Sequence, residues 1–228
     1  MARPLDLEEQ EQLDDLKHFW KQWGNLITWF LIAVFGSFAA WNGWNYWQRT
    51  QAAQSAAMYD EIDRAVAAGD TARVEQGFKD IKDKFGGTTY AQQAGLATAK
   101  VLMDKGQVDG AKSALQWVAS EASDPGYQAI ARLRLAALQV EAKAYDDALK
   151  QLAVDFPKEF QALAADRRGD VYNLQGKKNE AKAEYTKAWQ GLASEAEYRT
   201  LVEVKLTALG VDVQSLKQPA APAESAKS

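Results

Sequence analysis

The 228-residue sequence contains no cysteine and only one histidine, His18, which lies close to the N-terminus. The lack of cysteine excludes disulfide bonds, thiolate metal sites and thiol nucleophiles. The lack of histidine after residue 18 excludes histidine-based acid–base catalysis from the rest of the chain. Neither a G-x-S-x-G motif nor a phosphate-binding loop occurs. We therefore predict a protein that is not an enzyme and has no cofactor and no metal site.

The chain also lacks an excess of basic residues, because 27 lysines and arginines stand against 31 acidic residues. Nucleic-acid binding depends on a basic surface that neutralises phosphates, so no nucleic-acid partner is expected.

Charged side chains are absent between Lys21 and Arg49, and apolar residues dominate this stretch. The distance from Trp23 to Trp44 along a helix is roughly 31 Å, which matches a hydrocarbon core of about 30 Å. Tryptophans gather at both ends of the run, as in the aromatic belts of membrane proteins. A buried core helix of this length would not need that border, and a cleaved signal peptide would have a shorter apolar stretch. We predict an uncleaved transmembrane helix over residues 23–47.

Positive charges near this helix give a weak orientation signal. Arg3, Lys17 and Lys21 precede it, whereas Arg49 and Arg64 follow within twenty residues. The bias of three to two favours a cytoplasmic N-terminus, with the larger C-terminal part in the periplasm.

Residues 1–22 are acidic at first and basic later, with apolar residues at helical spacing. This amphipathic tail is predicted to be a helix that either lies on the membrane surface or continues into the anchor. Its charges form either a docking site for a cytoplasmic partner or a solvated face.

Period-two alternation of apolar residues is missing after residue 48, so no strand is expected there. A repeat is present instead. Gly69, Gly106, Lys143 and Gly176 are spaced by 37, 37 and 33 residues, and a small apolar residue follows each after five positions. A large apolar or aromatic residue comes four positions later: Phe78, Leu115, Leu152 and Tyr185.

This period predicts about four helix–turn–helix units over residues 48–214, each with a left-handed turn at the glycine position. A last helix over about residues 195–209 is expected to cap them. Residues 215–228 are rich in proline, alanine and serine and are predicted to be disordered. The fold class is therefore all-α: one N-terminal transmembrane helix followed by an α-solenoid.

The fourth unit is similar to a tetratricopeptide repeat at Gly169, Tyr172, Gly176, Ala181 and Tyr185. Together with the single anchor, the acidic preface and the tryptophan-rich border, this pattern resembles the YfgM family of bacterial inner-membrane proteins. The resemblance implies an ancillary subunit of the Sec translocon that works with the membrane-anchored periplasmic chaperone PpiD on newly exported proteins. It also links the N-terminal tail to a cytoplasmic response regulator of envelope stress, so a signalling adapter is the alternative function.

In tetratricopeptide repeats the first helix of each pair lines the concave face, which is the expected binding surface for a protein partner. The positions carried over by this resemblance are Leu96, Lys100, Met103, Ile130, Leu133, Ala137, Val140, Asp166, Asp170 and Asn173. Met103, Ile130, Leu133 and Val140 would form an apolar groove for an extended segment or a partner helix, or would belong to the core.

Asp166 and Asp170 flank Arg167 and Arg168, so they are interpreted as part of a solvated, charge-balanced helix rather than as a site of chemistry. In the anchor, Gly36, Ala40 and Gly43 offer small residues on which another helix could pack, or they face lipid.

Overall fold

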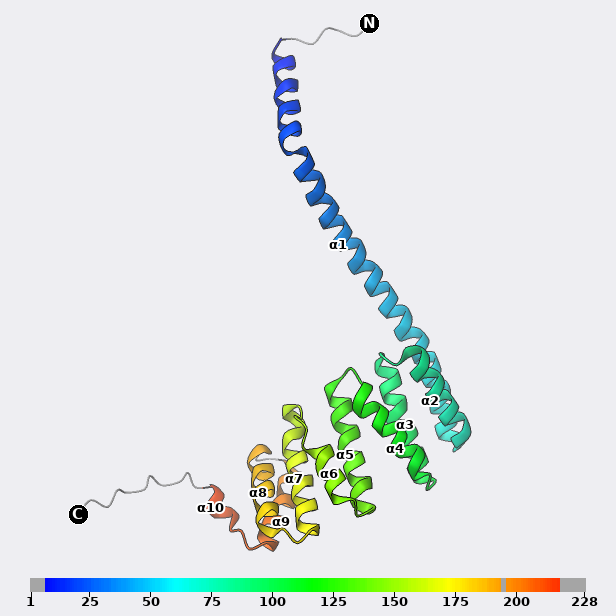
Figure 1. Cartoon of the computed structure of the whole chain (residues 1–228), viewed down its shortest axis with the longest axis vertical. Coiled ribbons are helices and arrows are strands. Elements are labelled where there is room, and N and C mark those ends of the chain that lie inside the picture. Colours follow the sequence, from blue (N-terminus) through cyan, green and yellow to red (C-terminus); the bar gives the residue numbers. More distant parts are fainter. Residues whose placement is uncertain (1–6, 194–195, 218–228) are drawn as a thin grey trace, which may run out of the picture. The chain divides into compact units, whose positions relative to one another are not determined.

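The computed structural model describes residues 7–193 and 196–217, which form helices joined by short turns (Figure 1). No strand occurs in these residues, so the predicted all-α class is confirmed. The chain divides into two compact units, Met1–Ala53 and Gln54–Ser228.

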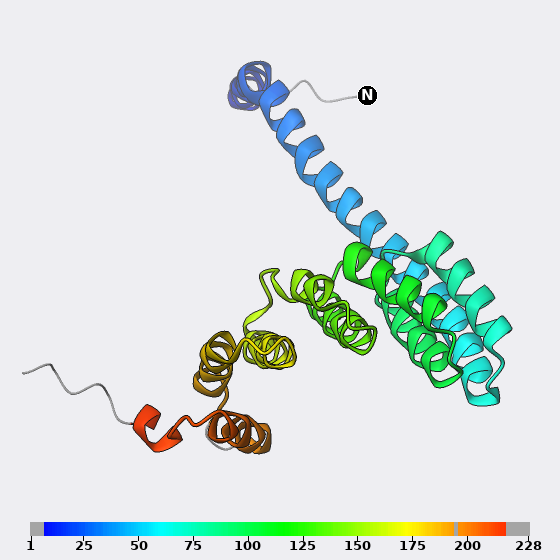
Figure 2. The ribbon, with the colours of Figure 1, turned by 60° about the horizontal axis from the view of Figure 1, so that its bottom comes forward.

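Helix α1 covers Leu7–Ala68 without a break at residue 22 or at residue 47. No proline lies between Pro4 and Pro125 to interrupt it. The described part of the N-terminal tail is therefore helical, and α1 changes direction between this part and the anchor (Figure 2). Residues 1–6 lie outside the described part. Within the described residues, α1 alone is long and apolar enough to cross a membrane. The side chain of Trp29 in this helix is 66% exposed, and a large apolar side chain is more stable in contact with lipid than with water.

The second unit holds the end of α1 and nine further helices of the described residues, named here in chain order. They are α2 (Thr71–Phe85), α3 (Thr89–Asp104), α4 (Val108–Glu121), α5 (Pro125–Glu141), α6 (Tyr145–Leu152), α7 (Lys158–Leu174), α8 (Lys178–Gly191), α9 (Glu197–Ala208) and α10 (Val213–Lys217).

The turn within each helix pair is left-handed at the predicted position. Gly69, Gly106 and Gly176 have φ angles of 67°, 72° and 76°, and Lys143 adopts 58° without being a glycine. In each turn two backbone hydrogen bonds close the helix end; the amide of Gly106 donates to the carbonyl of Met103, and that of Gln107 donates to Leu102. This is the Schellman pattern, which satisfies the last carbonyl groups of the helix. The predicted register of four units is confirmed.

The small residue five positions after each turn lies where the paired helices come closest. Val74, Ala111, Ala148 and Ala181 are all 0% exposed. The larger residues four positions later are buried as well: Phe78, Leu115, Leu152 and Tyr185. In the fourth unit a Cβ atom on Gly169 would lie 2.5 Å from the ring of Tyr185, so only glycine fits there. The repeated small and large positions are therefore the packing contacts of the solenoid.

The C-terminal end departs from the prediction. Gly210 has a φ of 81° and lies 34 residues after Gly176, so a fifth turn follows α9. Val213 in α10 is buried against the last core cluster. The expected capping helix corresponds to α9, but the helical domain extends to Lys217 rather than ending at residue 214. Residues 218–228 of the predicted disordered tail lie outside the described residues.

Successive helices pack against one another along the chain, as expected for stacked pairs (Figure 2). The first helix of a unit also contacts the first helix of the next, α3 with α5 and α5 with α7. This contact places the first helices on a shared inner face, which is where a tetratricopeptide-like solenoid binds its partners.

The left-handed turns predict opposite effects for exchanging glycine and lysine. Lys143→Gly removes a side chain from a left-handed position and should raise the free energy of unfolding by about 0.5–1 kcal/mol. Gly176→Lys creates the same strain and should lower it by about 1 kcal/mol. Urea unfolding of the full chain in detergent micelles measures both. A Gly176→Lys variant with an unchanged free energy of unfolding would contradict the proposed role of the turn.

Candidate protein-binding site

A groove with a volume of about 200 Å³ lies between α3 and α5 on the inner face. This volume is below the roughly 300–1,000 Å³ of small-molecule pockets, and it suits a single large side chain better. Ala99, Lys100 and Met103 from α3, Leu115 from α4, and Arg134, Ala137 and Leu138 from α5 line it.

The base of the groove is apolar and its edges are basic. Ala99 and Leu115 are 1% and 2% exposed, so they form the base. Lys100 is exposed and pairs with Asp104 at 2.8 Å on the same helix. The guanidinium of Arg134 donates to the carbonyl oxygen of Leu96 at 3.3 Å and forms no ion pair within the described residues. The groove therefore suits an apolar side chain that has a carboxylate beside it.

Of the ten residues predicted for the binding face, the groove brings together Lys100, Met103 and Ala137. Its remaining lining residues were not predicted. Arg134 and Leu138 lie on a helical stripe next to the predicted one, and nothing in the spacing of apolar residues distinguishes the two stripes.

The other apolar residues of the predicted groove do not share one surface. Ile130 packs against the first core cluster, whereas Leu133 and Val140 pack against the cluster around α6 and α7. Leu96 is only 9% exposed and belongs to the first core cluster. The prediction that Leu96 lies on the binding face is therefore wrong, because neighbouring helices cover this side of α3.

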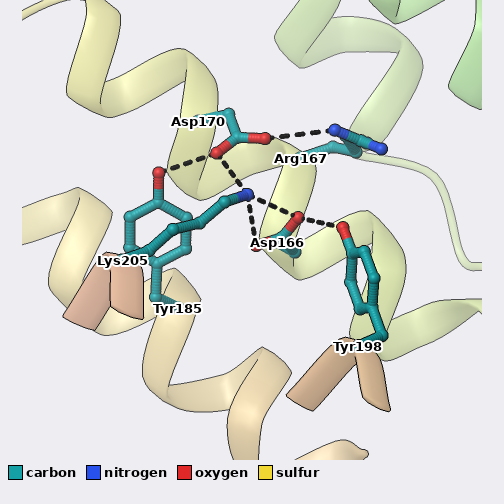
Figure 3. A network of polar contacts seen from close by, with 6 residues as sticks. All are labelled: Asp166, Arg167, Asp170, Tyr185, Tyr198 and Lys205. Carbon is teal, nitrogen blue, oxygen red and sulfur yellow. Dashed lines mark hydrogen bonds and ion pairs between the residues drawn. The ribbon is translucent and has the colours of Figure 1, made fainter. Parts of the chain in front are cut away.

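Asp166 and Asp170 lie in a network that joins three helices (Figure 3). The ammonium nitrogen of Lys205, on α9, is 2.8 Å from both carboxylate oxygens of Asp166 and 2.6 Å from Oδ1 of Asp170. The hydroxyl of Tyr185 donates to Asp170 at 2.8 Å, and that of Tyr198 donates to Asp166. These contacts fix α9 against α7 and α8.

The interpretation of Asp166 and Asp170 as a solvated helix face is therefore wrong. The side chain of Asp166 is 0% exposed and that of Asp170 is 27% exposed. The prediction that Asp166 lies on the binding face is wrong as well, because α9 covers its side chain. Asn173, one turn further along α7, is exposed.

The network also affects two tyrosines. Burial, followed by the hydrogen bond to Asp170, raises the pKa of Tyr185 above its usual 10.0. Burial and the bond to Asp166 raise the pKa of Tyr198 in the same direction. Because these pKa values are higher in the folded chain, the contribution of both groups to stability is present below pH 10 and is lost as the pH rises further.

In the anchor, Gly36 and Gly43 have open space around them, since a Cβ atom at either position would meet nothing within 4 Å. Ala40 lies on the same helical face and is exposed. The helix itself does not require these glycines, and each costs about 1 kcal/mol relative to alanine in a helix interior.

Within the part of the chain that the structure describes, no three His, Asp or Glu side chains gather in a way that could hold an ion.

The buried network predicts a large cost when its cation is removed. Lys205→Met leaves the fully buried carboxylate of Asp166 without its ion pair, whereas Asp170 keeps Arg167 at 3.3 Å. The free energy of unfolding should therefore fall by about 3 kcal/mol. Lys100→Met, which breaks an exposed pair, should change it by less than about 1 kcal/mol. Denaturant unfolding of both full-length variants makes the comparison. Equal effects of the two substitutions would show that the network does not hold α9 in place.

Comparison with known proteins supports the architecture over most of the chain. Residues 17–211 match the family model of the tetratricopeptide repeat-like domain. This range includes the predicted membrane helix and all five left-handed turns.

Four curated relatives carry the name ancillary SecYEG translocon subunit, and three of them show the range of similarity. The protein of Haemophilus influenzae is 32% identical over 188 residues, which cover 81% of this chain and 90% of the relative. That of Neisseria gonorrhoeae is 28% identical and covers 89% of this chain and 98% of the relative. The Escherichia coli protein is 27% identical over 80% of this chain and 85% of its own length. The chain therefore belongs to the tetratricopeptide repeat-like family of ancillary SecYEG translocon subunits, the YfgM family that its sequence resembles.

Proposed function

We propose that this protein is a non-catalytic scaffold of the bacterial inner membrane and an ancillary subunit of the Sec translocon. Its N-terminus lies in the cytoplasm and its repeat domain in the periplasm, where it works with the chaperone PpiD on newly exported proteins. The names of its relatives and the long apolar helix support the membrane and translocon parts of this proposal.

The observation that carries the proposal is the groove between α3 and α5. Its apolar base and basic edges offer a binding surface, and its size fits one large side chain of a partner protein. Full burial of a side chain such as leucine contributes about 1.5–3 kcal/mol, which is enough to decide a weak interaction. Met103 at the groove wall adapts its shape to different side chains. The partner is a segment of the chaperone or of an exported chain that places an apolar side chain in this groove.

The anchor provides the second contact of the proposal. Gly36, Ala40 and Gly43 let a helix of the translocon approach the backbone closely, which is how small residues promote helix association in lipid. Among the described residues, a Cβ atom at either glycine would meet nothing within 4 Å.

Filling the groove should release the periplasmic partner. Ala137 is exposed at the groove edge, so Ala137→Trp occupies the space without removing a core contact. Loss of one buried apolar side chain corresponds to roughly 10- to 100-fold weaker binding. We expect the chaperone that co-purifies with the tagged chain from solubilised membranes to fall at least fivefold, as measured by quantitative mass spectrometry.

The matched control is Ala183→Trp, which adds the same side chain at an exposed position of α8 outside the groove. This variant should retain the chaperone at the level of the unchanged chain. Retention of the chaperone by both variants would rule out the groove as its binding site.

A further inference from the structure

The part of α1 directly before the anchor carries an exposed apolar stripe. Its five large side chains are 40–61% exposed: Leu13, Leu16, Phe19, Trp20 and Trp23. With 3.6 residues per turn, they fall within an arc of roughly 120° around the helix. Asp14 and His18 lie on the opposite side of the helix and are exposed as well. Residues 13–23, called the tail segment below, are therefore amphipathic.

A straight continuation of the membrane helix would leave much of this stripe in water. The predicted hydrocarbon core begins at Trp23, and Leu16 and Leu13 lie roughly 10 and 15 Å further along a helix that rises about 1.5 Å per residue. The headgroup layer on one side of a bilayer is only about 5–8 Å thick, from the difference between the whole bilayer and its hydrocarbon core. Both leucines would therefore extend past the headgroups, where exposure of apolar surface is unfavourable.

The helix is not straight in this region, because α1 changes direction between the tail and the anchor (Figure 2). Two local features favour a bend there. Gly24 is buried, and a Cβ atom at this position would lie 3.0 Å from the indole ring of Trp20. The hydroxyl of Thr28 donates to the carbonyl oxygen of Gly24 at 2.7 Å, a contact that often bends helices. A bend at this place allows the tail segment to lie along the membrane surface.

The charges show which force holds the segment there. Residues 1–23 contain six acidic residues against three lysines and arginines, so attraction to anionic lipids cannot provide the contact. Lys17 is already paired with Asp14 at 2.9 Å. Lys21 forms no ion pair within the described residues and lies one turn from Lys17, where its long side chain can reach a lipid phosphate. Burial of the apolar stripe is therefore the main source of binding.

We propose that the tail segment lies on the membrane surface, with Leu16, Phe19 and Trp20 inserted between the lipids. The bilayer that holds the anchor covers the stripe, because the stripe ends where the uncharged run begins. Amphipathic helices with Trp, Phe and Leu on one face lie about 5–10 Å deep at the boundary of headgroups and acyl chains. A protein in the adjoining water can then contact only the polar face, which carries Asp14 and His18.

The test uses the absence of cysteine, because a single introduced cysteine can be labelled with a nitroxide without background. Three full-length variants are compared: Leu16→Cys on the stripe, and Asp14→Cys and His18→Cys on the opposite side. Each is reconstituted in phosphatidylcholine nanodiscs that hold one chain, so no second copy can cover the stripe. Electron paramagnetic resonance measures collisions of the label with oxygen, which concentrates in lipid, and with a water-soluble nickel chelate. We expect the oxygen-to-nickel ratio at position 16 to be at least five times the ratio at positions 14 and 18.

The two control positions distinguish the possible arrangements. In a helix that continues straight along the membrane normal, position 16 lies between positions 14 and 18 in depth, so its ratio would be intermediate. An intermediate ratio, or equally low ratios at all three positions, would overturn the proposal.

A charge on the stripe should release the tail segment from the lipid. Leu16→Glu is introduced into a chain that carries the label at Leu13→Cys, and His18→Glu in the same labelled chain is the matched control. The oxygen-to-nickel ratio at position 13 should fall at least fivefold with Leu16→Glu and change less than twofold with His18→Glu. Equal responses to the two substitutions would contradict the proposal. Because the nanodiscs contain neither translocon nor chaperone, the outcome does not depend on the groove between α3 and α5.

Discussion

The close approach of two helices across a left-handed turn is the constraint on which the repeat domain depends. It requires a residue with positive φ at the turn and a small residue five positions later, and the fully buried Ala111, Ala148 and Ala181 meet the second requirement. Each pair leaves one apolar side uncovered, which the next pair buries. Repetition of this unit therefore produces both the inner face with its groove and an end surface.

The two ends of the stack are closed in different ways. At the C-terminal end, Lys205 of α9 is held by Asp166 and Asp170, and breaking such a buried contact costs more than an exposed ion pair contributes. At the first repeat unit, the outer side of α1 and α2 carries charged residues such as Arg73 and Asp80, as expected for the polar outer face of a terminal repeat.

The turns, the close helix contacts and the anchor could be predicted from the sequence, because each has a local cause. The glycines of the turns, the small residues that follow and the apolar run of the anchor all depend on neighbouring residues. The partner of Asp166 could not be predicted, since Lys205 lies 39 residues away and helix periodicity shows only which face a residue is on. The same limit explains why the spacing of apolar residues places Leu96 on the binding face but not Arg134, and why it does not indicate α10 after Gly210.

The central claim is that the repeat domain, rather than the tail or the anchor, binds the periplasmic partner. The most direct measurement compares the proteins that co-purify from native membranes with the full chain and with a chain that ends at Ala53. Ala53 is the last residue of the compact unit that contains the tail and the anchor. The account predicts that the full chain retains the translocon and the chaperone, and that the shortened chain loses the chaperone. Retention of every partner by the shortened chain, or capture of only a cytoplasmic regulator by both, would contradict it.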